Sequence, residues 1–169
     1  PKYEKNMKIS LQKSVIYFFS AVIIVLLLIT LIIWMSKKFQ QISLKSGFMK
    51  HNGGLFFRKI SKTKFEFKTI IKKNHLNRAR ITHGGYIASI IDAGGGTAAH
   101  RVSEGKVCVT ISLDIKFIDG TRLGDEIVGI VNIQKLTRSL VFLDCKLKCK
   151  KRIIALASGI WKRTNKVLI

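Results

Sequence analysis

A histidine and two glycines stand where a helix N-terminus could stabilise a developing negative charge, and an aspartate follows nine residues after the histidine. His83, Gly84 and Gly85 come directly before an apolar segment with helical periodicity. Glycines at such a junction let the backbone N–H groups of a helix N-terminus approach a ligand closely. Asp92 lies within the apolar segment, where a carboxylate requires partners or a functional reason. The spacing predicts an oxyanion site, although Gly-Gly before a helix is also an ordinary turn and a lone helical Asp often faces water.

The segments around these residues predict one long helix packed on an antiparallel sheet, an α+β arrangement. Tyr86 to His100 repeats apolar residues at three- and four-residue steps, as in a helix. Val107 to Phe117 alternates apolar and polar residues without a break, which is typical of a strand. Further strands are expected in a hairpin over 55–71 and over 126–136, 139–148 and 152–162. A helix on one face of a curled sheet fits this order economically.

The N-terminal part contains an uncharged run over residues 14–35, which is long enough to predict a membrane-spanning helix. Lysines flank the run on both sides, so their distribution leaves the orientation open. The expected organisation is a basic tail (1–13), a transmembrane helix (14–35), a linker (36–47), a globular domain (48–163) and a C-terminal tail (164–169). The predicted localisation is a single-pass membrane protein.

The chain carries 31 basic and 9 acidic residues, for a formal net charge of +22. Such a balance suggests an anionic partner, or only a bias in amino-acid usage. No zinc-finger, helix-turn-helix or RNP-type pattern is present in the sequence, so nucleic acid is not the expected partner. A basic binder of nucleic acid or anionic lipid is one hypothesis for the function, and it rests on charge alone. The three cysteines have no spacing typical of a zinc site, and no metal is expected.

The joint spacing Asn77-x5-His83-Gly84-Gly85-x6-Asp92, with Thr110 eighteen residues later, resembles the PaaI-like acyl-CoA thioesterases of the hotdog-fold superfamily. The resemblance covers residues 48–163. Three further motifs support it: Phe48 to Gly54 before the first strand, Leu123-Gly124-Asp125 before a later one, and Ala155-x-Ala157-x-Gly159 near the end. The resemblance implies a hotdog fold, in which one long central helix is wrapped by a curled antiparallel sheet.

The resemblance also implies a role for each residue of the motif. The N–H of Gly84 and the side chain of Asn77 would polarise the thioester carbonyl. Asp92 would act as the general base on water or as a nucleophile, and the hydroxyl of Thr110 would help to place that water. His83 is expected to position its neighbours, because the family uses the carboxylate as the base.

The partners implied by the resemblance are an acyl-CoA substrate and a second copy of the chain. Two long helices would lie side by side in a dimer, the active site would take residues from both subunits, and dimers would often pair into tetramers. No metal or organic cofactor is expected. Hydrolysis of a cytosolic thioester requires the domain to face the cytoplasm.

Gly85, Arg80, Arg101 and Lys106 are the candidate substrate-binding residues. The three cations, together with Arg78, are the candidates for the phosphates of CoA, although each could also be a solvated surface charge. Arg80 is a departure from the pattern, because many relatives place Gly three residues after the Asn. An Arg in a tight turn there would either spoil the site or contact a phosphate. A non-catalytic acyl-CoA-binding hotdog protein therefore remains the alternative function.

Overall fold

The computed structural model describes residues 15–31, 38–42 and 47–167, and it divides the chain into two units, Pro1–Lys38 and Phe39–Ile169. Residues 15–31 of the first unit are helical. No helix in the described ranges is long and apolar enough to cross a membrane, so the predicted single-pass membrane localisation is wrong, and no transmembrane helix is found in the described part of 14–35. The remaining residues of the prediction, 14 and 32–35, and the basic tail over 1–13 lie outside the described ranges.

The second unit is built on a seven-stranded sheet in the order β1-β2-β3-β5-β6-β7-β4, in which every neighbouring pair is antiparallel. The strands are β1 (Gln40–Ile42), β2 (Leu55–Lys59), β3 (Lys64–Ile70), β4 (Lys106–Phe117), β5 (Glu126–Leu136), β6 (Leu140–Cys149) and β7 (Arg152–Val167). Two short helices, α2 (Phe48–His51) and η1 (Lys73–His75), flank the first hairpin. The strand β4 lies at one end of the sheet, beside β7. One of its edges therefore has no partner strand within the described domain.

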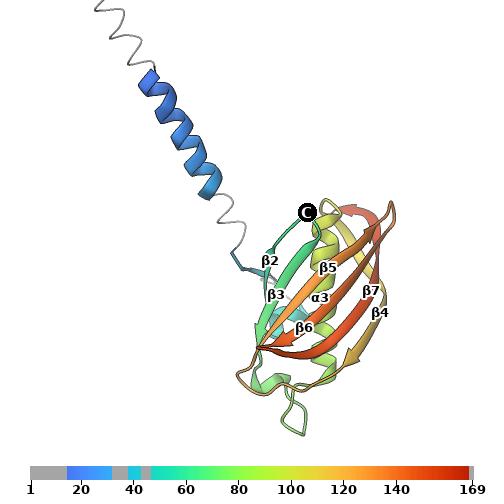
Figure 1. Ribbon diagram of the computed structural model, residues 1–169. Helices are drawn as coiled ribbons and strands as arrows, with labels where there is room; N and C mark the ends of the chain where they lie inside the picture. Colours follow the sequence, from blue (N-terminus) through green and yellow to red (C-terminus); the bar gives the residue numbers. More distant parts are fainter. Residues whose placement is uncertain (1–14, 32–37, 43–46, 168–169) are drawn as a thin grey trace, which may run out of the picture. The chain divides into compact units, whose positions relative to one another are not determined.

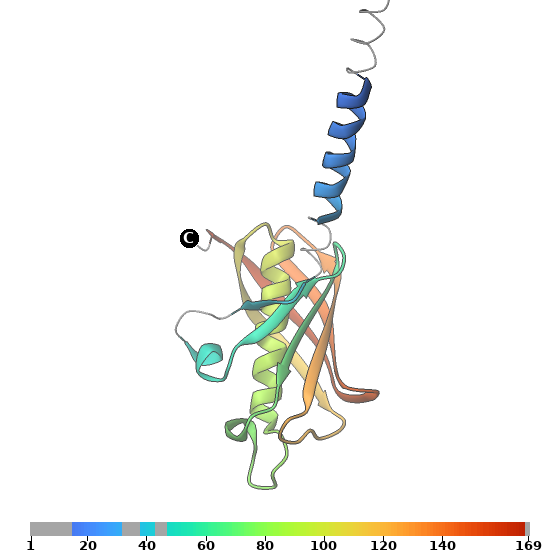
Figure 2. The ribbon, with the colours of Figure 1, turned by 90° about the vertical axis from the view of Figure 1, so that its left-hand side faces the viewer.

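One long helix, α3 (Gly84–Val102), lies along one face of the curved sheet (Figures 1 and 2). Its apolar residues at three- and four-residue steps, among them Ile87, Ile90 and Ile91, are buried against the strands. The sheet contributes alternate residues from each strand to the same core, as period-two side chains require. The largest of them are Phe65, Phe67 and Trp161.

Glycines bring α3 unusually close to the sheet. A methyl group added at Gly94 would overlap the ring of Phe67, and so would one at Gly129 of β5. One added at Gly95 would lie 2.9 Å from the ring of Trp161. The two aromatic rings therefore occupy the space that side chains at these glycines would need.

The predicted core architecture is confirmed: an α+β fold with a central helix and an antiparallel sheet. The helix begins two residues earlier than periodicity indicated, at Gly84, and ends two residues later, at Val102. Residues 40–42, within the segment expected to be a linker, form the edge strand β1 and pair with β2. Three residues are too few for apolar alternation to be recognised in the sequence.

A buried histidine ties the segment after β3 to the start of α3. The ring of His75 is stacked on Tyr86 with ring centroids 3.7 Å apart, and His75 is 2% exposed. Its Nδ1 accepts the N–H of Lys72 at 3.0 Å, so Nε2 carries the proton and donates to the carbonyl of Asn52 at 3.0 Å. The carbonyl of His75 accepts the N–H of His83 at 2.8 Å. The neutral imidazole therefore supports the residue from which α3 begins.

Acid is expected to destabilise the fold through His75. Burial, followed by the nearby positive charge of Lys72, lowers the pKa of His75 below its ordinary 6.5, although the carbonyl of Asn52 opposes the shift. Because the unfolded chain binds the proton more readily, the stabilisation is complete above pH 6.5 and is lost as pH falls below it. At pH 5.5 the loss from this group has an upper limit of about 1.4 kcal/mol.

Urea unfolding at pH 7.5 and 5.5 measures this effect. His75→Gln should lower stability at pH 7.5 and reduce the difference between the two pH values. The exposed His51 is the matched control, and His51→Gln should keep the wild-type dependence. An unchanged pH dependence in His75→Gln would show that another group is responsible.

Candidate active site

Asp92 lies midway along α3 and is joined to the sheet by one short hydrogen bond. The hydroxyl of Thr110, on β4, donates to Oδ1 of Asp92 at 2.5 Å. Both residues are exposed in the single chain. They line a hollow of about 350 Å³, whose other lining residues include Thr97, His100, Arg101, Cys108 and Trp161. Because Thr110 occupies one carboxylate oxygen, the second remains available to accept a proton from a bound water.

The start of α3 presents a free backbone donor. His83 is the N-cap, and its Nδ1 accepts the N–H of Gly85 at 2.9 Å. The N–H of Gly84, the first residue of the helix, has no acceptor among the described residues, as expected for the first turn. The cap thus fixes the turn and occupies the N–H of Gly85, whereas the N–H of Gly84 stays available to a ligand.

Asn77 presents a second free donor beside the first. Its Oδ1 accepts the N–H groups of Ala79 at 2.9 Å and Ile81 at 3.3 Å, which fixes the orientation of the side-chain amide. The Nδ2 group has no acceptor in the described part of the chain. Asn77 and Gly84 both line a second hollow, of about 320 Å³. Two donors that reach the same point of this hollow would stabilise an oxyanion there.

The two hollows of the single chain are separate. No residue lines both of them. Eight residues separate Gly84 from Asp92 along α3, which corresponds to about 12 Å. The strand β4 follows the same course, because Thr110 bonds Asp92 while the ring of Phe117 lies 3.5 Å from the position of a methyl group at Gly84. One chain therefore holds the donors and the carboxylate apart.

Comparison with solved structures defines this architecture. The PaaI protein of Escherichia coli superposes with a TM-score of 0.66 at 17% identity, over 72% of this chain and 86% of that one. A protein of Streptococcus mutans, solved with bound acetyl CoA, superposes with a TM-score of 0.63 at 22% identity, over 68% of this chain and 92% of that one. Residues 80–155 match the thioesterase superfamily in sequence. The domain has the hotdog fold of that superfamily.

Two relatives share recognisable sequence with the hotdog domain. An inferred esterase of Pseudomonas aeruginosa is 27% identical over 124 residues, which are 73% of this chain and 92% of that protein. The mouse acyl-coenzyme A thioesterase 13 is 26% identical over 89 residues, which are 53% of this chain and 64% of that protein. Both similarities agree with an ester or thioester as the chemical class to be tested.

The predicted substrate-binding residues are dispersed around the hotdog domain. The N–H of Gly85 is occupied by the His83 cap. Arg101 lines the hollow of Asp92, and Lys106 begins β4. Arg80 stands in the turn that orients Asn77 and has a φ of 59°, in the left-handed region that glycine favours. The departure from the family pattern is thus accommodated by a strained backbone.

Sequence reasoning missed two buried threonines that line the hollow of Asn77 and Gly84. Thr82 and Thr121 are buried there and bonded to each other through Oγ1 atoms 2.7 Å apart. Thr121 belongs to the connection between β4 and β5, which Arg152 contacts from the start of β7. These residues lie far apart in sequence and carry no local motif. The only sequence signal was the position of Thr82, directly before His83.

Replacing Arg80 by glycine is expected to stabilise the hotdog domain. The left-handed conformation costs an ordinary residue about 1–2 kcal/mol, which glycine does not pay. The greater freedom of glycine in the unfolded chain offsets part of this stabilisation. Arg80→Gly should therefore raise the free energy of unfolding by about 0.5–1 kcal/mol in urea titrations. Arg78, in the same turn without a positive φ, is the matched control, and Arg78→Gly should lower it. Equal effects of the two substitutions would contradict the explanation.

Proposed function

We propose that the protein is an acyl-CoA thioesterase, which hydrolyses the thioester to a free acid and CoA. One observation carries the proposal: Asn77 and Gly84, each with an unoccupied donor, line one hollow, while a Thr-bonded carboxylate, Asp92, is exposed in another. Support also comes from the thioesterase superfamily match, the mouse acyl-coenzyme A thioesterase and the structural neighbour with bound acetyl CoA.

The reaction proceeds through a tetrahedral oxyanion. The thioester carbonyl oxygen accepts hydrogen bonds from the Gly84 N–H and Asn77 Nδ2. Asp92 takes a proton from the water that Thr110 helps to place, and the water oxygen forms a bond to the carbonyl carbon. The carbon–sulfur bond then breaks, and the CoA thiolate takes up the proton that Asp92 accepted, which restores the carboxylate. Each preformed donor is worth about 3–4 kcal/mol in the transition state.

The complete site requires a second copy of the chain. The free edge of β4 carries the exposed apolar residues Val109, Ile111 and Phe117, which are typical of an edge that is covered in an assembly. A two-fold axis near residues 113 and 114 would pair two β4 strands in antiparallel fashion. Asp92 and Thr110 of one subunit would then face Phe117 and Gly84 of the other. Association of such dimers into tetramers stays a prediction.

The CoA moiety would lie along the mouth of this shared site. Arg80, beside the oxyanion donors, and Arg101, beside Asp92, are the proposed contacts for its phosphates, with Lys106 at the start of β4. Guanidinium groups bind phosphate in a bidentate manner, which gives a reason for retaining an arginine in a strained turn. The same observation favours a second candidate, an acyl-CoA-binding protein without catalytic activity.

Asp92→Asn separates the two candidates. Loss of the base should reduce thiol release from a panel of acyl-CoAs, acetyl to palmitoyl and phenylacetyl, by about 10²–10⁴-fold in kcat, with little change in KM. The exposed Asp144 of β6, which accepts a bond from Gln134 of the neighbouring β5, is the matched control. Asp144→Asn should retain wild-type rates. Tight binding of acyl-CoA without thiol release by the wild-type protein would favour the binding protein.

Mixing two inactive variants tests whether the site is shared. Asn77→Ala lacks an oxyanion donor and Asp92→Asn lacks the base, so in a shared site each mixed dimer has one intact site and one with both defects. After subunit exchange at equal concentrations, about a quarter of the wild-type activity should return, because half of the dimers are mixed. A site formed within one chain would give no recovery. The wild-type protein mixed with either variant provides the reference for exchange.

A further inference from the structure

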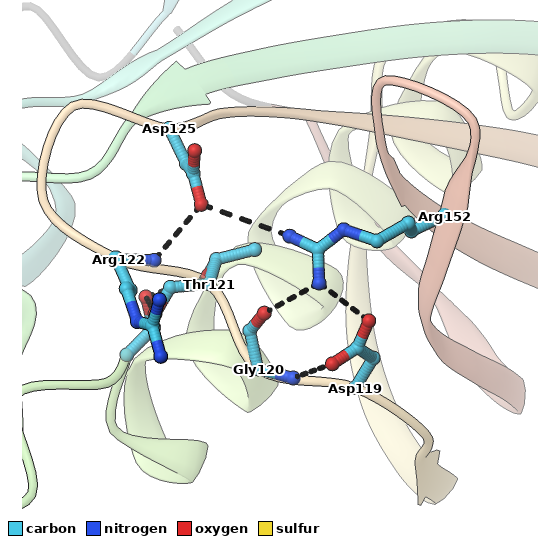
Figure 3. Close-up of polar contacts among 7 residues, drawn as sticks. Asp119, Gly120, Thr121, Arg122, Asp125 and Arg152 are labelled. Carbon is cyan, nitrogen blue, oxygen red and sulfur yellow. Dashed lines mark hydrogen bonds and ion pairs between the residues drawn. The ribbon is translucent and has the colours of Figure 1, made fainter.

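The connection between β4 and β5, residues 118–125, is held at both ends by one arginine (Figure 3). The Nη1 group of Arg152 donates to Oδ2 of Asp119 at 2.5 Å and to the carbonyl of Gly120 at 3.2 Å. Its Nη2 group lies 3.9 Å from Oδ2 of Asp125. One guanidinium thus bridges two carboxylates that stand six positions apart.

Each carboxylate also bonds the backbone of the loop to which it belongs. Oδ1 of Asp119 accepts the N–H of Gly120 at 2.7 Å, and Oδ2 of Asp125 accepts the N–H of Arg122 at 2.9 Å. The bond from Arg152 is the main reason that the pKa of Asp119 lies below its ordinary value. Backbone bonds join the ends of the loop to Ile71 and Ile154, and the contacts of Arg152 and the two carboxylates hold the backbone nearer to Thr121.

Thr121 connects this loop to the start of α3. Its carbonyl accepts the N–H of Thr82 at 2.8 Å and the hydroxyl of Thr82 at 3.2 Å. Thr82 immediately precedes His83, the N-cap whose position directs the N–H of Gly84. Both threonines are buried, and the loop residues Asp119, Gly120 and Thr121 line the same hollow as Asn77 and Gly84.

We propose that Arg152 is a positioning residue for the oxyanion site. It fixes the 118–125 loop, the loop fixes Thr82 through Thr121, and Thr82 fixes the turn that carries Gly84. Arg152 itself touches neither the substrate nor the reacting atoms in this arrangement. The inference rests on the proposed function, because it assigns the loop a part in the same reaction.

Arg152→Gln tests the proposal, since it removes the charge and cannot reach all three acceptors. Amide hydrogen exchange in the intact chain should show Thr82 exchanging at least about 10-fold faster, while amides of the core strand β6 keep their protection. In acyl-CoA hydrolysis, kcat should fall about 10-fold with KM within about two-fold, because a displaced donor weakens the transition state more than substrate binding. Arg152→Lys should recover part of both effects, since it keeps the charge but loses the fork.

Arg58→Gln is the matched control. Arg58 forms an ion pair of the same kind with Glu66 across β2 and β3, and it has no bond to the 118–125 loop. This variant should leave Thr82 exchange and kcat unchanged. Wild-type values of both in Arg152→Gln, or faster exchange throughout the core, would overturn the positioning role. A wild-type protein without thioesterase activity would refute the proposed function instead, and the Thr82 exchange rate would still decide whether Arg152 holds the turn.

Discussion

The contact between α3 and the sheet is the constraint on which the other features depend. Phe67 fills the space between Gly94 of the helix and Gly129 of β5, and Trp161 fills the space beside Gly95. Larger residues at these glycines would move the helix away from the strands, since close-packed cores transmit such changes. The height of α3 above the sheet in turn determines whether Asp92 can reach the hydroxyl of Thr110. The chemistry proposed for this domain therefore depends on the packing of two aromatic rings against glycines.

The start of α3 illustrates how a protein can keep donors available for a ligand. Polar groups in this turn are nearly all satisfied within the chain: Gly85 by the His83 cap, and the Asn77 oxygen by two backbone N–H groups. These internal bonds occupy the acceptors on His83 and Asn77 and fix the backbone of the turn. The Gly84 N–H and the Asn77 Nδ2 group stay free to donate to a ligand. Preorganisation of this kind avoids reorganising the site when negative charge develops.

The sequence indicated the long-range plan well where the pattern is periodic, and poorly where a contact joins distant segments. The strand over 126–136 was predicted to the residue, because an apolar run there ends at the tight connection of Thr137 and Arg138. Arg80 was recognised as unusual, but its positive φ is a property of the folded turn. The role of Arg152 had no local signature, since its partners are 27 to 33 positions away. The predicted membrane localisation was wrong, since no helix among the described residues is long and apolar enough to cross a membrane.

The free edge of β4 has a further consequence when it is considered together with the charge of the chain. A net charge of +22 makes two copies repel each other at long range, whereas the apolar side chains of Val109, Ile111 and Phe117 attract at contact. Dissolved salt screens the repulsion within about 10 Å at 0.1 M and leaves the apolar attraction intact. Ionic strength would then favour association of the edges, the reverse of its effect on an interface built from ion pairs. The number of complete sites in the proposed dimer would then rise with the salt concentration.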